Sequence, residues 1–319
     1  MKRRIHVAAG VLAGADGKIL VARRFDDAHQ GGLWEFPGGK LESGEDTTTG
    51  LARELAEEIG ITLDSARPLI RVHHDYADRD VLLDVWRVTG WQGEVHGREG
   101  QELQWLDVDA LAALPMPAAD VPVVTALRLP DSYLVTPSPG ENVENFLTAL
   151  SASIDTGVKL VALRAKELPS PEYLSLCRQA VDVCHAGGAH LLINTDPGLL
   201  DASGADGVHL DSGRLMAARS RPVPAGAWLA ASCHDASELD QAARVGVDFA
   251  VLSPVGATRS HPQAVPMGWP RFRQLVERVN LPVFALGGMA PEHMSAAWEN
   301  GGQGIAAVRA LWKSSQAGP

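Results

Sequence analysis

The sequence predicts an α/β protein in two parts, a mixed α/β domain over residues 1–130 and a (β/α)8 TIM barrel over residues 131–319. A proline-rich stretch, Leu114 to Pro130, separates two different patterns of apolar residues. Before it, hairpin-like segments and one amphipathic helix follow one another irregularly. After it, short apolar runs recur at helix-length intervals, as expected of parallel strands that are buried on both faces.

The first part contains a hairpin, a helix and two later strands. Apolar residues from Ala8 to Arg24 flank an Asp16-Gly17 turn, which is typical of a hairpin. A helix is expected over Thr47–Ile59, because Gly60 follows it as a C-cap. The two later strands are expected at Val81–Thr89 and Leu103–Leu106.

The second part contains eight predicted strands: Tyr133–Val135, Leu160–Leu163, Leu191–Asn194, Gly207–Leu210, Trp228–Ser232, Phe249–Ser253, Val283–Leu286 and Ile305–Val308. In such a barrel, functional groups lie at the C-terminal ends of the strands. This rule selects Arg164, Lys166, Asn194, Asp211, Ser232, Ser253 and the pair Gly287-Gly288. The glycine pair has two readings, a phosphate cradle of backbone N–H groups or a packing and turn role.

Charge, hydrophobicity and cysteine content limit the classes of protein to which the chain can belong. The 319 residues carry a net charge of −11, which disfavours a nucleic-acid polymer as partner. No apolar run approaches the ~20 residues of a membrane span, so no membrane partner is expected. The three cysteines form no CxxC pair, which favours the reducing cytoplasm.

The segment from Gly39 to Ile61 concentrates acidic residues on one helix. Glu54, Glu57 and Glu58 stand at i, i+3 and i+4, so their carboxylates share one helical face. Like charges on one turn repel, and Mg²⁺ removes this conflict because it prefers a few carboxylates together with waters and substrate phosphates. Arg53 and Glu45 are placed to pair and to orient the loop against the helix. A run of glutamates alone would indicate a solvated acidic face, but here it occurs together with Glu45, Arg53, Gly60 and the upstream Pro37-Gly38-Gly39 turn. This combination predicts a magnesium site.

This segment resembles the Nudix box, and Leu33 to Lys40 resembles its entry in the MutT-type 8-oxo-dGTP diphosphatases. The resemblance implies an α/β/α sandwich with a mixed sheet and a Mg²⁺-dependent diphosphohydrolase, with Mn²⁺ as a substitute. The metal ligands it implies are Gly38, Glu54, Glu57, Glu58 and Glu99. The catalytic residues it implies are Glu54, Glu57, Glu99 and Arg53. Arg24 and Lys40 match basic residues that bind the phosphates of a nucleoside triphosphate.

Asp120 stands where that family has a purine-reading asparagine. An amide both donates and accepts hydrogen bonds, whereas an ionised carboxylate only accepts. Asp120 is therefore either a substrate-binding residue that accepts from an N–H of an oxidised purine, or an N-cap or turn residue in a proline-rich segment.

Residues 132 to 312 resemble thiamine phosphate synthase through Leu163–Lys166, Gly204–Leu210 and the segment that ends in Gly287-Gly288. The chain departs from that family where the synthase does its chemistry. Thr195 and Arg214 replace two Mg²⁺-binding aspartates, although Asp196 follows Thr195. The diphosphate-binding loop reads Thr258-Arg259-Ser260-His261, and Arg309 replaces a serine. These departures predict a barrel without synthase activity, which either senses a phosphate-containing ligand or a nucleotide or is kept only as a folding partner.

Three functions remain open at this point. The first is hydrolysis of 8-oxo-dGTP to 8-oxo-dGMP and diphosphate, which sanitises the nucleotide pool and so protects DNA replication. The second is hydrolysis of thiamine diphosphate analogues, suggested by the fused barrel. The third is a nucleotide hydrolase that is regulated by a ligand of the barrel.

Overall fold

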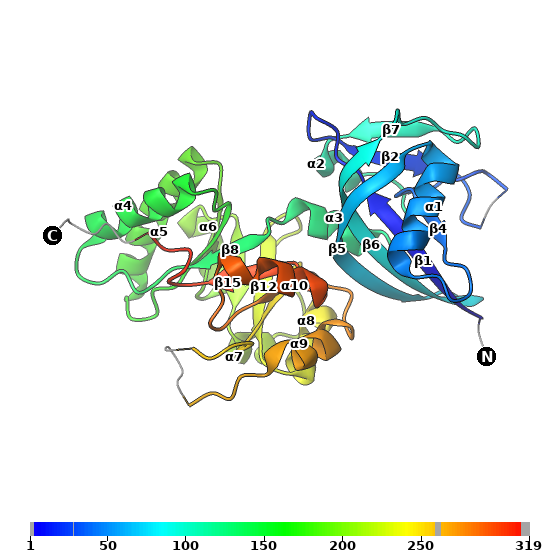
Figure 1. Ribbon diagram of the computed structural model, residues 1–319. Coiled ribbons are helices and arrows are strands. Elements are labelled where there is room, and N and C mark those ends of the chain that lie inside the picture. Colours follow the sequence, from blue (N-terminus) through cyan, green and yellow to red (C-terminus); the bar gives the residue numbers. More distant parts are fainter. Residues whose placement is uncertain (1–2, 28, 259–262, 314–319) are drawn as a thin grey trace. The chain divides into compact units, whose positions relative to one another are not determined.

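The computed structural model describes residues 3–27, 29–258 and 263–313. The chain divides into two compact units, Met1–Arg128 and Leu129–Pro319, coloured from blue to cyan and from green to red in Figure 1. The boundary expected from the sequence lies between residues 130 and 131. None of the helices in the described ranges is long and apolar enough to cross a bilayer.

Two sheets form the framework of the N-terminal unit. The larger has the strand order β4-β1-β6-β5, and the smaller has the order β3-β2-β7. Strand β1 pairs in parallel with β6 and antiparallel with β4, so the larger sheet is mixed. The strands are β1 (Arg3–Val11), β2 (Ile19–Arg23), β3 (Trp34–Glu35), β4 (Gly38–Lys40), β5 (Thr62–Asp75), β6 (Arg79–Gln92) and β7 (Leu103–Leu106).

Helices cover both faces of the larger sheet. Because successive side chains of a strand point to opposite faces, Ala8 and Ala9 of β1 belong to different core clusters. Ala8 packs with Leu51 and Leu55 of α1 (Thr47–Ile59). Ala9 belongs to the cluster that contains residues of α2 (Val108–Leu111) and α3 (Val121–Arg128). The predicted α/β/α sandwich with a mixed sheet is confirmed.

Helix α1 has the bounds that the sequence predicts. Asp46 caps its first turn by accepting the backbone N–H groups of Thr48 and Thr49. Gly60 ends it at φ +75°, a left-handed conformation that glycine adopts without a steric penalty.

The predicted hairpin around Asp16-Gly17 forms only next to its turn. The turn is present, with Gly17 at φ +80°, and the residues on either side of it are joined by an antiparallel Ala13–Ile19 bridge and by backbone hydrogen bonds from Gly14 to Lys18 (2.8 Å) and from Leu20 to Leu12 (3.1 Å). Beyond these contacts, β1 and β2 lie in different sheets. Each strand instead pairs with segments distant in the sequence, because these pairings complete two buried sheets.

The C-terminal unit is a closed barrel of eight parallel strands in the order β10-β11-β12-β13-β14-β15-β8-β9, which confirms the predicted TIM barrel. The strands are β8 (Ser132–Val135), β9 (Leu160–Leu163), β10 (His190–Ile193), β11 (Gly207–Leu210), β12 (Trp228–Cys233), β13 (Phe249–Leu252), β14 (Val283–Ala285) and β15 (Gly304–Ala307). Each observed strand lies within one residue of its predicted bounds.

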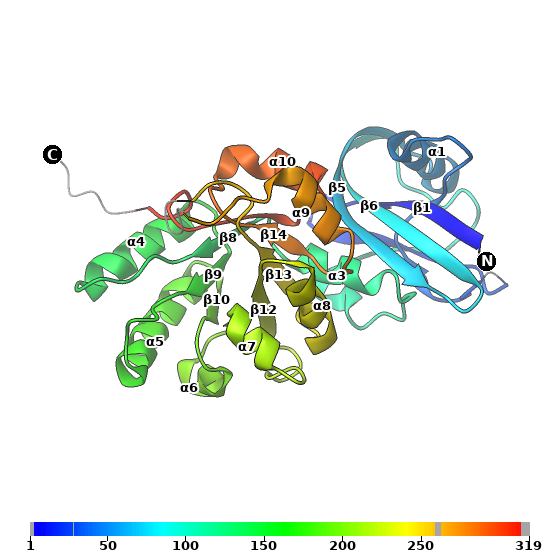
Figure 2. The ribbon, with the colours of Figure 1, turned by 90° about the horizontal axis from the view of Figure 1, so that it is seen from below.

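Helices surround the barrel strands, as Figure 2 shows. They are α4 (Val143–Asp155), α5 (Ser170–Ala186), α6 (Leu200–Ser203), α7 (Ser212–Ala217), α8 (Ala236–Val245), α9 (Gly268–Val276) and α10 (Met294–Glu299), with 3-10 turns η1 (Pro197–Leu199) and η2 (Pro291–His293). The interior is filled by the rings of Tyr133, Phe249 and Phe284, whose centroids lie 5.3 to 5.7 Å apart. The barrel therefore has a packed core, and only its ends are open to ligands.

Candidate active site

Helix α1 and the loop before it form an ion-pair network around Arg53. Its guanidinium donates to Glu45 Oε2 and to Glu54 Oε1, each at 2.9 Å. It also donates to Glu57 Oε2 and to the carbonyl oxygen of Lys40, each at 3.2 Å. One arginine thus ties β4 and the loop to α1 and holds glutamates of like charge near one another.

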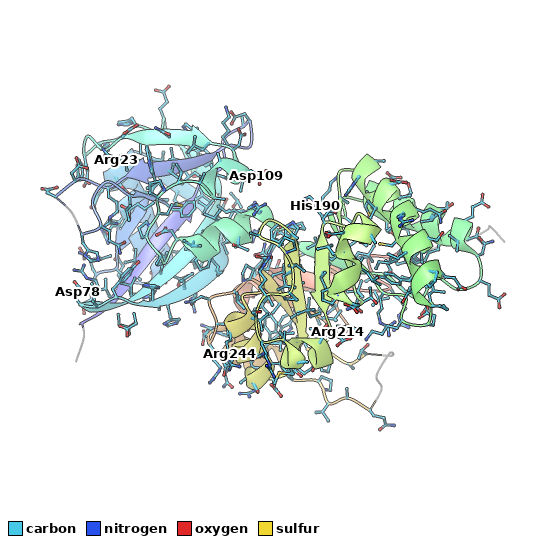
Figure 3. All side chains as sticks on the ribbon, turned by 180° about the vertical axis from the view of Figure 1, so that it is seen from behind. Arg23, Asp78, Asp109, His190, Arg214 and Arg244 are labelled. Carbon is cyan, nitrogen blue, oxygen red and sulfur yellow. The ribbon has the colours of Figure 1, made fainter. Side chains whose placement is uncertain are left out.

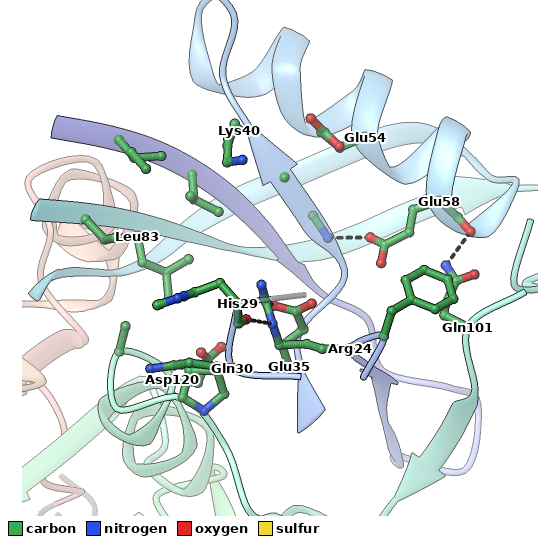
Figure 4. A pocket seen from close by; sticks show the side chains of 18 of the residues that line it. Arg24, His29, Gln30, Glu35, Lys40, Glu54, Glu58, Leu83, Gln101 and Asp120 are labelled. Atoms are coloured by element: carbon green, nitrogen blue, oxygen red, sulfur yellow. Dashed lines mark hydrogen bonds and ion pairs between the residues drawn. The ribbon is translucent and has the colours of Figure 1, made fainter. Parts of the chain in front are cut away.

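A pocket of about 460 Å³ lies beside this network (Figure 4). Its acidic end is formed by Glu54, Glu58 and Glu99. The other end carries Glu35, Tyr76 and Asp120, and its apolar wall comes from β1 and β6. Cationic side chains also line the pocket, namely Arg23, Arg24, Lys40 and Arg79. The pocket therefore combines groups suited to a metal and phosphates with groups suited to a polar planar ring.

Two glycines of β4 bring the backbone against the acidic end. A Cβ on Gly38, which has φ +149°, would lie 2.1 Å from the carbonyl oxygen of Ala8. A Cβ on Gly39 would lie 2.1 Å from Glu54 Oε2. Glycine is thus required at position 38 because a side chain there would clash with the backbone of Ala8. At position 39, the missing side chain leaves the space that the Glu54 carboxylate occupies.

These contacts predict different effects for two alanine substitutions. Gly39→Ala should lower kcat/KM by about 10²-fold, because Glu54 must leave its position, while the thermal midpoint changes little. Gly38→Ala should destabilise the fold by about 2–4 kcal/mol, because backbone atoms cannot move aside cheaply. Steady-state kinetics and thermal unfolding of both variants test this. Equal losses of stability would contradict it.

The carboxyl group of Glu58 has a pKa close to neutral pH. Its Oε2 accepts the backbone N–H of Gly38 at 2.7 Å. Burial and, to a smaller extent, the negative charges of Glu35, Glu99 and Glu54 raise the pKa of Glu58 to about 7, against the opposing effect of the Gly38 N–H. The negative charge at the acidic end is therefore not fully compensated by the positively charged groups around it.

This donor set suits a hard divalent cation, which prefers carboxylate and carbonyl oxygens. In the described ranges, no three His, Cys, Asp or Glu side chains already surround one point. Arg53 holds Glu54, and the Gly38 N–H holds Glu58. A cation would offset both the burial and the neighbouring negative charges that raise the Glu58 pKa, so the residues fit the metal that the Nudix-like spacing implies.

Glu99 reaches the pocket because its loop docks on the end of α1. Gln101 Nε2 donates to the carbonyl oxygen of Glu58 at 2.8 Å, and Gln101 Oε1 accepts the Glu99 N–H at 3.1 Å. Arg98 adds a bond from its guanidinium to the Ala56 carbonyl oxygen at 2.9 Å. These C-terminal carbonyls of the helix have no partner within it, so the loop satisfies them. Sequence reasoning missed Gln101 and Arg98 as the residues that place Glu99.

Glu57 lies apart from the other acidic residues. Its side chain is 60% exposed, and it contacts Arg53. It is absent from the residues that line the pocket. The structure thus brings Glu54, Glu58 and Glu99 to one pocket and leaves Glu57 on the solvent side of Arg53.

The two basic residues selected from the sequence differ in their contacts. Arg24 pairs with Glu35 and donates to the carbonyl oxygen of His29 at 2.9 Å. Burial raises the pKa of Glu35, against the lowering effect of Arg24. Lys40 lines the pocket near Glu54, and its side chain is exposed (Figure 4). Lys40 is available to a phosphate, whereas Arg24 is engaged with Glu35.

Asp120 lies at the end of the pocket opposite the acidic cluster and is 6% exposed. Burial raises the pKa of Asp120 to about 8, and the charge of Glu35 adds to this effect against the Phe36 backbone N–H and Arg24. At pH 7 the group is therefore mostly a neutral carboxyl, which donates one hydrogen bond and accepts others. Tyr76 shares this end and accepts the Ala119 N–H at 3.4 Å. Sequence reasoning did not select Tyr76 or Glu35, since only the fold brings them to Asp120.

The C-terminal ends of the barrel strands carry the polar residues selected from the sequence. Asp211 follows β11, accepts from Arg214 and lies 4.0 Å from Lys166 Nζ. The Gly287-Gly288 pair packs closely on the loop after β13, because a Cβ on Gly288 would lie 2.4 Å from the Ala257 carbonyl oxygen. This contact supports the packing role of the pair. Arg259, Ser260 and His261 lie outside the described residues.

Two family models match the chain. The model described as NUDIX domain matches residues 8–126, and the model described as thiamine monophosphate synthase matches residues 132–311. The chain belongs to both families. Its N-terminal unit is a Nudix hydrolase of the MutT type, and its C-terminal unit is a thiamine monophosphate synthase-family barrel.

Curated relatives match each unit separately. The 8-oxo-dGTP diphosphatase of Escherichia coli is 36% identical over 126 residues, 40% of this chain and 98% of that protein. The CTP pyrophosphohydrolase of the same organism is 35% identical over 124 residues, 39% of this chain and 91% of that protein. The putative thiamine-phosphate synthase 2 of Aquifex aeolicus is 34% identical over 182 residues, 57% of this chain and 97% of that protein.

Proposed function

We propose that the Nudix domain hydrolyses oxidised purine nucleoside triphosphates in the cytoplasm, converting 8-oxo-dGTP to 8-oxo-dGMP and diphosphate. It would thereby remove damaged precursors before DNA replication uses them. The observation that carries this proposal is the single pocket that joins three glutamates at one end to the buried Asp120 at the other. A nucleoside triphosphate needs both ends, one for its phosphates and one for its base.

At the acidic end, Glu54, Glu58, Glu99 and the Gly38 carbonyl would hold Mg²⁺, or Mn²⁺ in its place. The cation supplies countercharge to the phosphates and makes a bound water more acidic. Glu54 and Glu99 are the candidates to accept the proton of the attacking water, since both line the pocket. Arg53 orients Glu54, and Glu57 would join the ligands by turning its exposed side chain past Arg53.

Cationic side chains would bind the phosphates. Lys40 is free to contact them, and Arg24 would reach them only after exchanging its contact with Glu35. Such countercharge stabilises the negative charge that develops on the leaving diphosphate.

At the other end, a neutral Asp120 matches the edge of an oxidised purine. 8-Oxoguanine presents an N7–H donor beside the O6 acceptor, whereas guanine presents acceptors at both positions. A protonated carboxyl accepts from the first and donates to the second, as an amide does. Against guanine, one of its two hydrogen bonds is lost, and a buried polar group is left unpaired. Asp120 would therefore discriminate in favour of the oxidised base.

The test is to measure kcat/KM with Mg²⁺ on 8-oxo-dGTP, dGTP, CTP and thiamine diphosphate analogues, with diphosphate and phosphate followed separately. We expect 8-oxo-dGTP to be preferred over dGTP by at least about tenfold, the worth of one hydrogen bond in a buried site, with release of diphosphate. Equal or better turnover of dGTP or CTP would contradict the assignment of the base.

A second candidate is favoured by the fused barrel of the thiamine monophosphate synthase family. In this reading, the Nudix domain removes unwanted analogues of thiamine diphosphate. Efficient cleavage of a thiamine compound beside slow, unselective turnover of nucleotides would support it. Acceleration of nucleotide hydrolysis by a ligand of the barrel would instead support the regulated hydrolase.

A further inference from the structure

At the C-terminal mouth of the barrel, the two described acidic side chains beside Thr195 and Arg214, Asp196 and Asp211, are already engaged by protein groups. Both oxygens of Asp211 are engaged: Oδ1 accepts the Arg214 backbone N–H at 2.9 Å, and Oδ2 accepts from the Arg214 guanidinium. Asp196, the nearest alternative acid after β10, accepts the Gly198 N–H at 2.9 Å and caps η1. The magnesium implied by the synthase family therefore does not fit these residues.

Positive side chains stand at this mouth instead. Arg214 pairs with Asp211, and Lys166 Nζ lies 4.0 Å from the same carboxylate. Arg164, which directly follows β9, forms no ion pair among the described residues. Arg214 and Lys166 thus share one carboxylate, and Arg164 adds a further positive charge at this end of the barrel. This excess of positive charge attracts an anion rather than a metal ion.

The acidic side chains that follow β12 are also engaged, and Asp235 caps α8 by accepting the Glu238 backbone N–H. Glu238 Oε2 accepts the backbone N–H of His234 at 2.7 Å and contacts its ring nitrogen at 2.8 Å. Ser212 donates to the other oxygen of Glu238. Glu238 is therefore not available to neutralise the cations of the mouth.

A chain of hydrogen bonds through Tyr133, His209 and Ser232 adds a hydroxyl donor at the mouth of the barrel. His209 is 4% exposed, and its Nδ1 and Nε2 lie 2.8 Å from the Tyr133 hydroxyl and 2.7 Å from Ser232 Oγ. Burial lowers the pKa of His209 to about 4, so the ring is neutral and carries one N–H. The hydroxyl of the fully buried Tyr133 has no other hydrogen-bond partner among the described residues, so we assign it as the donor to Nδ1, which leaves the N–H on Nε2, directed at Ser232. With this tautomer, Ser232 accepts from His209, keeps its own hydrogen to donate and is not activated as a nucleophile.

We propose that the mouth of the barrel binds a phosphoryl-bearing anion through Arg164, Lys166, Arg214 and Ser232, without a divalent cation. Guanidinium and ammonium groups supply the countercharge that a metal would otherwise supply. Without a metal, the site lacks the usual stabilisation of a diphosphate leaving group, so the barrel serves for binding and not for synthase chemistry. This proposal does not depend on the substrate of the Nudix domain.

The test is calorimetric titration of the full chain with inorganic diphosphate and with inorganic phosphate, in the presence of EDTA. We expect saturable binding of one diphosphate per chain, with phosphate binding more weakly. Arg214→Gln and Lys166→Gln should each weaken diphosphate binding by about 10-fold or more, because each removes a charge-assisted contact. The matched control is Arg244→Gln. Arg244 lies on the neighbouring helix α8, where it contacts Gln241. Figure 3 labels both Arg214 and Arg244.

Two further variants keep the test decisive. Lys40→Gln should leave the binding in EDTA unchanged, because Lys40 belongs to the Nudix pocket. If Arg214→Gln unfolds, Lys166→Gln replaces it, since the side chain of Lys166 is 51% exposed. Absence of binding at millimolar diphosphate, binding that requires Mg²⁺, or binding that is lost in Lys40→Gln but retained in Arg214→Gln would overturn the proposal.

Discussion

Substitution of Glu54 by glutamine should lower kcat/KM for the preferred nucleotide by about 10²–10⁴-fold, the range for loss of a catalytic acid or base. The amide keeps the shape of the side chain but cannot carry the negative charge needed to bind a cation or accept a proton. Glu54 lines the pocket, and its carboxylate occupies the space that Gly39 leaves open. The loss should appear mainly in kcat, because the base end of the pocket is unchanged.

The matched control is Glu42→Gln, because the side chain of Glu42 is exposed and lies outside the pocket. It should retain the activity of the unmodified chain. Thermal unfolding of the Glu54→Gln chain should show a change of no more than about 1 kcal/mol, since its contact with Arg53 is partly exposed. A Glu54→Gln chain of full activity would refute the assignment of the acidic end.

The second large effect is a dependence of oxidised-base binding on the proton of Asp120. kcat/KM for 8-oxo-dGTP should be highest below pH 8 and should fall by up to about tenfold for each pH unit above it, since the pKa of Asp120 is about 8 and the ionised carboxylate no longer donates to the O6 acceptor. The Asp120→Asn chain should not show this fall, because the amide donates and accepts at every pH. The ratio of the kcat/KM values of the two chains on 8-oxo-dGTP, measured from pH 6 to pH 10, gives this comparison.

The Asp120→Asn chain also controls for ionisation of the nucleotides, because both chains meet the same substrates. Asp109→Asn serves as the surface control, since that side chain is 82% exposed. If the unmodified chain and the Asp120→Asn chain give the same pH profile on 8-oxo-dGTP, the proton of Asp120 has no role in binding the oxidised base.

The pH dependence of the free energy of unfolding gives an independent test of whether Asp120 is protonated. Folding raises the pKa of Asp120 from 3.8 to about 8, so the native state binds the proton more tightly than the unfolded state. The free energy of unfolding should therefore fall as pH rises between these values, by at most about 1.4 kcal/mol per pH unit. Asp120→Asn should remove this slope, and denaturant unfolding at several pH values would show it.

Local sequence patterns determined much of this protein. The bounds of α1 follow from the cap Asp46, the apolar positions and Gly60, all of which act within one or two turns of the helix. The barrel strands follow from short apolar runs, because strands buried on both faces need apolar residues throughout. The glutamates on one face of α1 follow from helical periodicity alone.

The tertiary structure decided which of these groups meet. Strands β1 and β2 separate into two sheets, because each pairs along its length with segments distant in the sequence. Glu35 and Tyr76 reach Asp120 from segments far apart in the sequence, and burial then raises the pKa of Asp120. Likewise, the docking of Gln101 and Arg98 on α1 brings Glu99 to the pocket. Periodicity and capping act between near neighbours in the chain, whereas burial and charge depend on everything that packs around a group.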